Sequence, residues 1–241
     1  MTKALHENKV EFKVSARNAL FTDPLTKIGG EKCTYQIPTY EALKGIISSV
    51  YWKPTFIWYI DKVRVMKQIQ TESKGIRTLK YNSGNDLSIY TYLKDVEYQV
   101  VAHFEWNDNR TDLWEDRNEN KHHNIAKRMI ERGGRRDIFL GTRECQGYVE
   151  PCLFGEGDGY YDNVEEIAFG LMYHGITYPD ESKDNEKIMT TNFWFPKMKN
   201  GIIEFKRPEE CAARRKLHSF EMKEFSSEKE NFSGLIEFEE G

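Results

Sequence analysis

Residues 38–65 read PTYEALKGIISSVYWKPTFIWYIDKVRV, a stretch that places an amphipathic helix directly before a buried strand. Thr39 suits the N-cap of the helix, because its side-chain oxygen can accept a hydrogen bond from a free N–H of the first turn. Apolar residues then recur at helical spacing, at Leu43, Ile46, Ile47 and Val50. Pro54 ends the helix. Residues 55–65 are β-branched and aromatic, which predicts a buried strand.

Two further strands are predicted on either side of this stretch. Residues 10–21 alternate loosely between apolar and polar positions and form the first strand, and residues 97–106 form another. The intervening residues 66–95 are polar and rich in turn formers, so they predict a long inserted hairpin.

A second helix is expected to run to about Arg132. Asp116 and Glu119 have the spacing of a capping box at its start. The glycine pair at 133–134 stops the helix. Residues 138–154 then predict a further strand or a bent pair of strands.

The resulting order, β-α-β-β-α-β, fits a ferredoxin-like unit, an architecture that RNA-recognition domains also use. We therefore predict an α+β protein whose residues 1–154 form a ferredoxin-like domain, with 66–95 inserted in it. Short strands separated by turns predict a small antiparallel β domain over residues 155–216. The remaining residues, 217–241, form an acidic tail.

The net charge of −4 argues against a nucleic-acid partner only when it is averaged over the whole chain. The tail carries seven acidic residues against two lysines, a net charge of −5, so residues 1–216 carry +1. Residues 121–143 alone carry +5. A local basic patch matters more to a phosphate chain than the charge of the whole protein does.

Several classes of protein are disfavoured by the sequence. There is no apolar run of the roughly 20 residues that a membrane helix needs, and no secretory signal is visible at the start. The four cysteines, Cys33, Cys145, Cys152 and Cys211, lack the spacing of a zinc site. We expect free thiols in a reducing cytoplasm and no metal.

Lys121 and His122 lie near the start of the predicted second helix. A helix start carries free N–H groups and partial positive charge, which favour a bound phosphate. There His122 could donate a proton while Lys121 stabilises a phosphorane-like charge. The alternative is structural, because His122 also begins the apolar stripe formed with Ile125, Ala126, Met129 and Ile130. The pair His122-His123 does not indicate a metal, since neighbours on a helix diverge by about 100°.

Aromatic and basic residues at two further places are candidates for RNA contacts. Tyr51 could deprotonate a ribose 2′-hydroxyl if a cation such as Lys121 lowered its pKa from about 10. Trp52 could stack on a base. The alternative is an aromatic helix end that packs beneath the sheet. Arg135 and Arg136 either offer bidentate phosphate ligands or form a solvated helix end.

Four motifs resemble one protein family. They are ALFTDPLTKIGGEK at residues 19–32, YWKPT at 51–55, KH at 121–122 and GGRRDIFLGTRECQGY at 133–148. Together they resemble the fifth CRISPR-associated subunit in its type I-C form, over about residues 10–211. The resemblance implies the repeat-associated RNA-binding superfamily, with a ferredoxin-like N-terminal domain and a small C-terminal β domain.

The type I-C branch resembles an active endoribonuclease that cuts the repeat hairpin of precursor CRISPR RNA. Its catalytic tyrosine, lysine and histidine map onto Tyr51, Lys121 and His122. The implied reaction is a metal-independent transphosphorylation without a cofactor. Tyr51 would help to deprotonate the attacking 2′-hydroxyl, Lys121 would stabilise charge, and His122 would protonate the leaving 5′ oxygen. The candidate RNA-binding residues are Trp52, Lys53, Lys127, Arg128, Arg135, Arg136 and Arg143.

The resemblance also implies partners. These are the repeat hairpin, the 5′ handle of the mature CRISPR RNA, and the large and repeated backbone subunits of a type I-C surveillance complex in antiviral defence. Two alternatives stay open. One is a non-catalytic RNA-binding subunit that caps the 5′ end of the guide, and the other is an unrelated ferredoxin-like interaction domain. The latter predicts no salt-dependent affinity for RNA.

Overall fold

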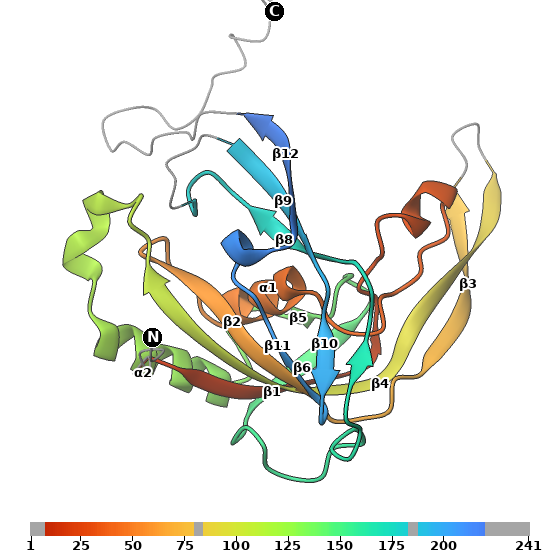
Figure 1. Cartoon of the computed structure of the whole chain (residues 1–241), viewed down its shortest axis with the longest axis horizontal. Coiled ribbons are helices and arrows are strands. Elements are labelled where there is room, and N and C mark those ends of the chain that lie inside the picture. Colours follow the sequence, from red (N-terminus) through yellow and green to blue (C-terminus); the bar gives the residue numbers. More distant parts are fainter. Residues whose placement is uncertain (1–7, 80–83, 183–187, 220–241) are drawn as a thin grey trace, which may run out of the picture.

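The protein combines two antiparallel sheets with few helices. This computed structural model describes residues 8–79, 84–182 and 188–219. The larger sheet has nine strands in the order β5-β6-β1-β4-β2-β11-β10-β7, with β3 paired to β4 outside that path. A separate sheet has the order β12-β9-β8 (Figure 1). The predicted mixture of α and β structure is confirmed.

One side of the larger sheet, from its β5 edge to β2, is built from strands that the sequence predicts. They are β1 (Val10–Ala19), β2 (Phe56–Val65), β4 (Asn85–Trp106), β5 (Ile138–Phe139) and β6 (Gln146–Pro151). β4 lies between β1 and β2 and pairs with both. Because these five strands are consecutive neighbours in the order β5-β6-β1-β4-β2, their side chains form a continuous floor for the core.

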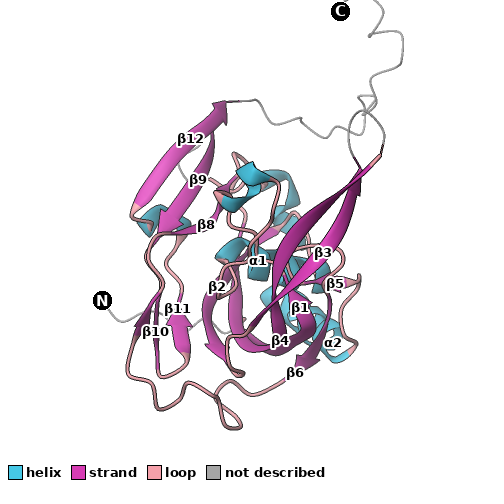
Figure 2. Ribbon diagram, turned by 90° about the vertical axis from the view of Figure 1, so that its right-hand side faces the viewer, coloured by secondary structure: helices cyan, strands magenta, loops and turns pink. Residues whose placement is uncertain are grey.

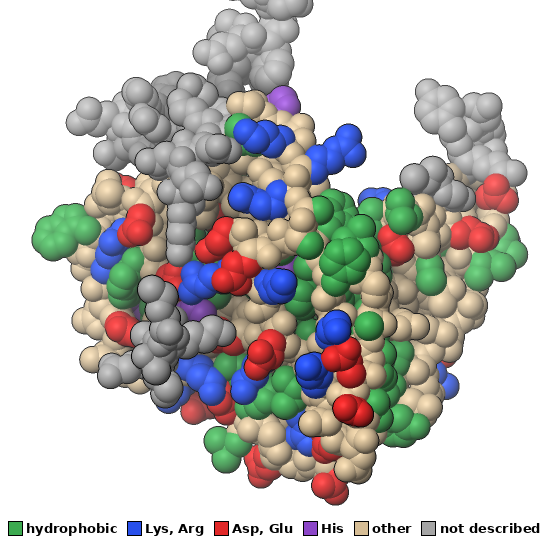
Figure 3. Space-filling view, viewed as in Figure 1, with side chains coloured by type: hydrophobic (Ala, Val, Ile, Leu, Met, Phe, Trp, Pro, Cys, Tyr) green, Lys and Arg blue, Asp and Glu red, His purple; other side chains and the backbone are tan. Residues whose placement is uncertain are grey.

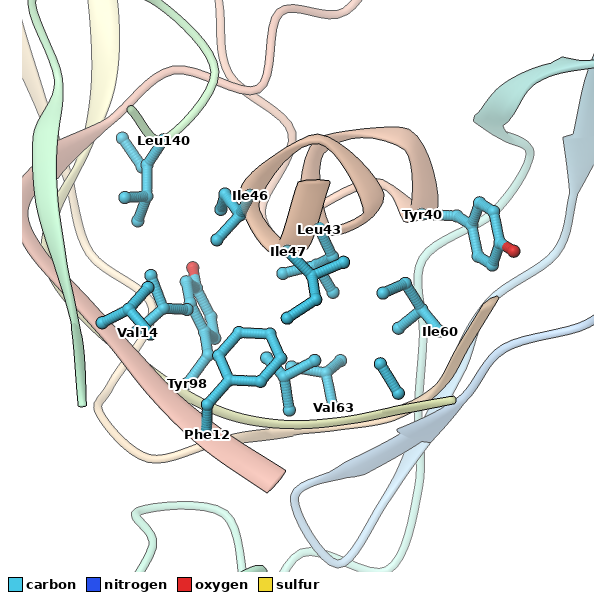
Figure 4. Packing of buried hydrophobic residues seen from close by; sticks show 14 of the residues in the cluster. Phe12, Val14, Tyr40, Leu43, Ile46, Ile47, Ile60, Val63, Tyr98 and Leu140 are labelled. Atoms are coloured by element: carbon cyan, nitrogen blue, oxygen red, sulfur yellow. The ribbon is translucent and has the colours of Figure 1, made fainter. Parts of the chain in front are cut away.

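Helix α1 (Tyr40–Val50) lies in the hollow of the curved sheet, as Figure 2 shows. Its predicted N-cap is confirmed, because the Thr39 side chain accepts a hydrogen bond from the backbone N–H of Ala42. In Figure 4 the buried α1 residues Leu43, Ile46 and Ile47 point onto the sheet. The labelled sheet residues include Phe12 and Val14 of β1 and Tyr98 of β4. Each such side chain contributes roughly 1.5–3 kcal/mol by leaving water.

Helix α2 (Glu119–Glu131) follows a short 3-10 helix, η2 (Thr111–Asp116). The predicted capping box is wrong, because Asn118 is the N-cap and its side chain accepts from the Lys121 backbone N–H. An N-cap must have non-helical φ and ψ directly before the first helical residue, and Asn118 has them. Asp116 ends η2 instead, which leaves its carboxylate available to other partners.

Strand β4 runs without interruption for 22 residues and joins two parts of the molecule. Its first part pairs with β3 (Thr71–Leu79), from Thr71 opposite Leu93 to Leu79 opposite Asn85. We call this pair, residues 71–79 and 85–93, the arm; it extends away from α1 in Figures 1 and 2. The strand predicted at 97–106 is therefore the last part of a longer strand. Asp95, with a φ of 50°, marks an irregularity between the two parts.

The segment predicted as a second domain, 155–216, contributes to both sheets. The larger sheet takes β7 (Ile167–Ala168), β10 (Lys197–Lys199) and β11 (Ile202–Glu204), the last of which pairs with β2. The smaller sheet consists of β8 (Met172–Thr177), β9 (Ile188–Trp194) and β12 (Ala213–Ser219). Two further 3-10 helices are η1 (Thr26–Gly29) and η3 (Pro208–Glu210).

The predicted domain limits are not tested by this arrangement, and the boundary at residue 154 stays a prediction. β12 includes residues 217–219 of the predicted acidic tail, whose remainder, 220–241, lies outside the described residues.

Candidate active site

Tyr51 is fixed at the end of α1 by three hydrogen bonds. Its backbone N–H donates to the Ile47 carbonyl at 2.9 Å, and its own carbonyl accepts from the Trp58 indole N–H at 2.7 Å. Its hydroxyl lies 2.7 Å from Nδ1 of His122. Only 4% of the Tyr51 surface is exposed. The side chain is thus held in one place, with its hydroxyl directed at α2.

His122 is buried and both nitrogens of its ring are engaged. The ring has no exposed surface, and Nε2 lies 2.8 Å from the backbone carbonyl oxygen of Asp116. A carbonyl can only accept, so Nε2 carries a proton, and in the tautomer with a single proton Nδ1 accepts from the Tyr51 hydroxyl. The ring packs against the aromatic side chains Phe56, Phe104 and Trp106. The predicted stripe is correct, since His122 and Ala126 are both buried on one side of α2.

The Asp116 carboxylate lies near His122 and contacts the polar side chains of Lys121 and Thr55. Lys121, whose side chain is half exposed, places Nζ 2.6 Å from Asp116 Oδ1. Thr55 donates its hydroxyl to Oδ2 at 2.8 Å. The Lys121 bond holds the pKa of the Asp116 carboxyl below its usual range, with help from Thr55 and against the effect of partial burial. Asp116 is therefore ionised throughout the neutral range.

The pKa of Tyr51 lies above its ordinary value. Burial is the largest cause, the negative charge of Asp116 adds to it, and the positive charge of Arg135 opposes it. The sequence suggested that Lys121 could lower this pKa, but the Lys121 ammonium is paired with Asp116 instead. Tyr51 is consequently a neutral hydroxyl at pH 7, and it needs a proton acceptor before it can act as a base.

The candidate RNA-binding residues are all exposed, and the structure brings some of them together. Trp52, Arg135 and Arg136 line one hollow of about 270 Å³ at the end of α1. Lys121, Lys127 and Arg128 line another on α2. Lys53 and Arg143 line neither of these two hollows. Arginines beside an exposed indole suit a strand of RNA, because they bind phosphate while the ring stacks on a base.

The family model described as CRISPR-associated protein (Cas_Cas5), of the Cas5d type, matches residues 10–206. The chain belongs to this Cas5 family. The matched residues include Tyr51, Asp116, Lys121 and His122, and they end before η3 and β12.

Relatives of this Cas5 chain are known from sequence and from structure. A protein of Mannheimia succiniciproducens named CRISPR pre-crRNA endoribonuclease Cas5d is 28% identical over 226 residues, or 82% of this chain and 94% of the relative. A crystal structure described as a CRISPR-associated protein is 38% identical with a TM-score of 0.73. A functionally uncharacterized protein from Streptococcus mutans is 40% identical with a TM-score of 0.72. Both structural matches cover 86% of this chain and 96% of the other.

Sequence reasoning missed Asp116 and the basic strand of this Cas5 chain. Asp116 stands five residues before Lys121, a spacing that gave no signal beyond helix capping. Figure 3 shows Lys and Arg side chains over β12, where Arg214, Arg215 and Lys216 are exposed. The three basic residues are adjacent in the sequence and could have been noticed as a charge run.

His123, the neighbour of His122, places Nε2 3.0 Å from the Lys9 carbonyl and does not join the site. In the described part of the chain, no three His, Cys, Asp or Glu side chains are grouped as metal ligands. No helix among the described residues has the length and apolar character needed to span a membrane.

Proposed function

We propose that this Cas5 chain is a metal-independent endoribonuclease that cuts precursor CRISPR RNA at the repeat hairpin. The observation that carries the proposal is the 2.7 Å contact between the Tyr51 hydroxyl and Nδ1 of His122, together with Asp116, which contacts both Nε2 of His122 and the Lys121 ammonium. This arrangement supplies a proton acceptor and a cation at one place. The Mannheimia relative, named as a pre-crRNA endoribonuclease, supports the class of substrate.

The first step is deprotonation of the ribose 2′-hydroxyl. Its proton moves to the Tyr51 oxygen while the phenolic proton passes to Nδ1 of His122. The imidazolium that results is stabilised by the Asp116 carbonyl at Nε2. The 2′ oxygen then attacks the adjacent phosphorus. A neutral tyrosine can serve as the base in this way because His122 accepts its proton in the same step.

The second step is departure of the 5′ oxygen. His122 has no exposed surface, so it reaches the substrate only through Tyr51. The acid role that the resemblance suggested for His122 therefore passes to Lys121, whose exposed ammonium can neutralise the phosphorane and donate a proton to the leaving oxygen. The products are a 2′,3′-cyclic phosphate and a 5′-hydroxyl. Each proton transfer contributes about 10²–10⁴ in rate.

The fold and the partners form part of the same proposal. The strand order β6-β1-β4-β2, with α1 after β1 and α2 after β4, supports a ferredoxin-like domain. Residues 155–216 would form the small C-terminal β domain. The hollow at Trp52, Arg135 and Arg136 would grip the repeat hairpin and then the 5′ handle. The chain would remain, in the cytoplasm, with the large and repeated backbone subunits of a type I-C surveillance complex.

The proposed reaction predicts a specific dependence on the 2′-hydroxyl. Purified protein in excess EDTA is expected to cut labelled repeat RNA at one position. The same RNA with a single 2′-deoxy nucleotide 5′ of the scissile phosphate is expected to remain intact, because the nucleophile is missing. Gel analysis of single-turnover reactions, with phosphatase treatment to detect the cyclic end, measures both results.

Two outcomes would contradict this. Cleavage of the deoxy substrate at the same position would exclude attack by the 2′ oxygen. Tight binding of both RNAs without any cut would leave the non-catalytic subunit that caps the guide, a role that the complete burial of His122 also suits.

The two arginines are predicted to contribute affinity that depends on salt. Arg135→Gln with Arg136→Gln is expected to weaken repeat binding by about 100-fold or slightly more, since each of the two charge-assisted contacts is worth about 1.5 kcal/mol and about 1.4 kcal/mol is tenfold in affinity. The slope of log K against log[salt] should fall by roughly 1.4 for two lost phosphate contacts. Filter binding over a salt series measures both. The control is Lys197→Gln with Lys199→Gln, which removes the same charge from two lysines that pair with Glu166. An equal loss of RNA affinity in this control would rule out a specific binding site at Arg135 and Arg136.

A further inference from the structure

Asp116 contacts two of the three proposed catalytic residues, Lys121 and His122. Its Oδ1 lies 2.6 Å from Lys121 Nζ, and its backbone carbonyl lies 2.8 Å from Nε2 of His122. Its Oδ2 lies 3.5 Å from the same His122 nitrogen. One residue thus contacts both Lys121 and His122, through its side chain and its main chain.

The position of Asp116 is itself fixed from outside the site. Thr55, which is 1% exposed, donates to Oδ2, and its own carbonyl accepts from the Asn107 N–H at 2.9 Å. Arg117 donates to the Asn107 carbonyl at 2.9 Å. The turn that carries Asp116 is therefore tied to the start of β2 on one side and to the end of β4 on the other.

We propose that Asp116 is a positioning residue that holds the Lys121 ammonium and the His122 ring in one arrangement beside the Tyr51 hydroxyl. This inference rests on the proposed nuclease function. A free lysine side chain has four rotatable bonds and explores many rotamers. The carboxylate confines it before RNA arrives, so less order has to be imposed when the phosphate enters.

The two contacts can be separated by substitution. Asp116→Asn keeps the backbone carbonyl that accepts from His122, and its amide oxygen can still accept from Thr55. It removes the negative charge that Lys121 contacts. Thr55→Val keeps the shape of the buried threonine but removes the hydrogen bond that Thr55 donates to Asp116 Oδ2. Neither variant removes a group that touches the substrate.

We expect Asp116→Asn to lower the single-turnover rate at saturating RNA by about 10-fold or more, with affinity for the repeat unchanged within twofold. Thr55→Val should give a smaller loss, about threefold.

A double-mutant cycle separates positioning from general stability. In a Lys121→Ala background, Asp116→Asn should have little further effect on rate, because its main partner is gone. Equal effects in both backgrounds would overturn the positioning role. Asp112→Asn is the matched control, since Asp112 lies on the same η2 turn but pairs with Arg110. It should leave the rate unchanged.

Failure of this inference is distinct from failure of the proposed function. A wild-type chain that binds the repeat and never cuts it overturns the nuclease itself. An inactive Tyr51→Phe chain beside a fully active Asp116→Asn chain overturns only the role of Asp116. If Asp116→Asn melts early, full activity of a well-folded Thr55→Val chain at every pH has the same meaning.

Discussion

Tyr51→Phe is expected to lower the rate of repeat cleavage by about 10³-fold, within the range that one positioned proton transfer contributes. The phenyl ring keeps the packing against Phe56 and the backbone bonds that end α1. The variant loses only the oxygen that passes a proton from the substrate to His122. Affinity for RNA should therefore change less than twofold. Single-turnover cleavage and filter binding on one preparation measure the two quantities.

A matched control is Tyr98→Phe, a second buried tyrosine that lies on β4 away from the site. It should retain the wild-type rate. A Tyr51→Phe chain that cuts at more than a tenth of the wild-type rate would contradict the role of the hydroxyl, since a residue that relays the proton cannot be that dispensable.

His122→Leu is expected to reduce cleavage by about 10²–10³-fold, because Tyr51 loses its proton acceptor. The variant also leaves the buried Tyr51 hydroxyl without a partner, which costs about 1–3 kcal/mol of stability. The combination with Tyr51→Phe should be hardly slower than Tyr51→Phe alone, since the two residues act as one unit. Rates at a temperature well below unfolding, beside thermal melts, measure both effects.

The control is His123→Ala on the adjacent position of α2, which should cut at the wild-type rate because the His123 ring is hydrogen-bonded to the Lys9 carbonyl and not to Tyr51 or Asp116. Equal losses in the two histidine variants would indicate damage to α2 in general. Multiplicative losses in the Tyr51 and His122 pair would show that they act independently, and would contradict the relay.

The elements with strong local signals could be predicted from the sequence. Thr39, the helical spacing of Leu43 and Ile47, and Pro54 each act within one or two turns, so α1 begins and ends close to where they place it. The aromatic run of β2 likewise has its length and position correct. Such signals depend on neighbours in the chain and need no knowledge of the tertiary structure.

Pairing between distant segments could not be predicted in this way. β11 pairs with the edge of β2, although more than 130 residues of chain separate the two strands. A strand of three residues is too short for its hydrophobic pattern to indicate which strand it pairs with. The continuity of β4 was missed because its first residues, 85–91, mix polar and apolar side chains and are mostly exposed, so they lack the pattern of a buried strand. The turn before α2 was misassigned because both Asp116 and Asn118 can cap a helix, and only backbone geometry decides between them.

The sequence named residues of the candidate site but not the contacts between them. Tyr51, Lys121 and His122 entered through family resemblance; the structure places Tyr51 against His122, and it places both Lys121 and His122 against Asp116. Burial of His122 follows from the apolar stripe of α2, yet the stripe alone could not reveal that Nδ1 meets a tyrosine from another helix. Asp116 acts through tertiary contacts, which no spacing in the sequence records.

The unbroken run of β4 makes the arm an adjustable spacer. Its first residues, 85–90, pair with β3 in the arm, whereas Phe104 and Trp106 near its end pair with β2 and pack against His122. Deleting two residues from each strand of the arm would keep every remaining side chain on its own face, because the side-chain period is two. Each such cut would draw the tip closer to the sheet by about 7 Å. The reach of the molecule can thus be changed in steps while the strand end under His122 stays in register.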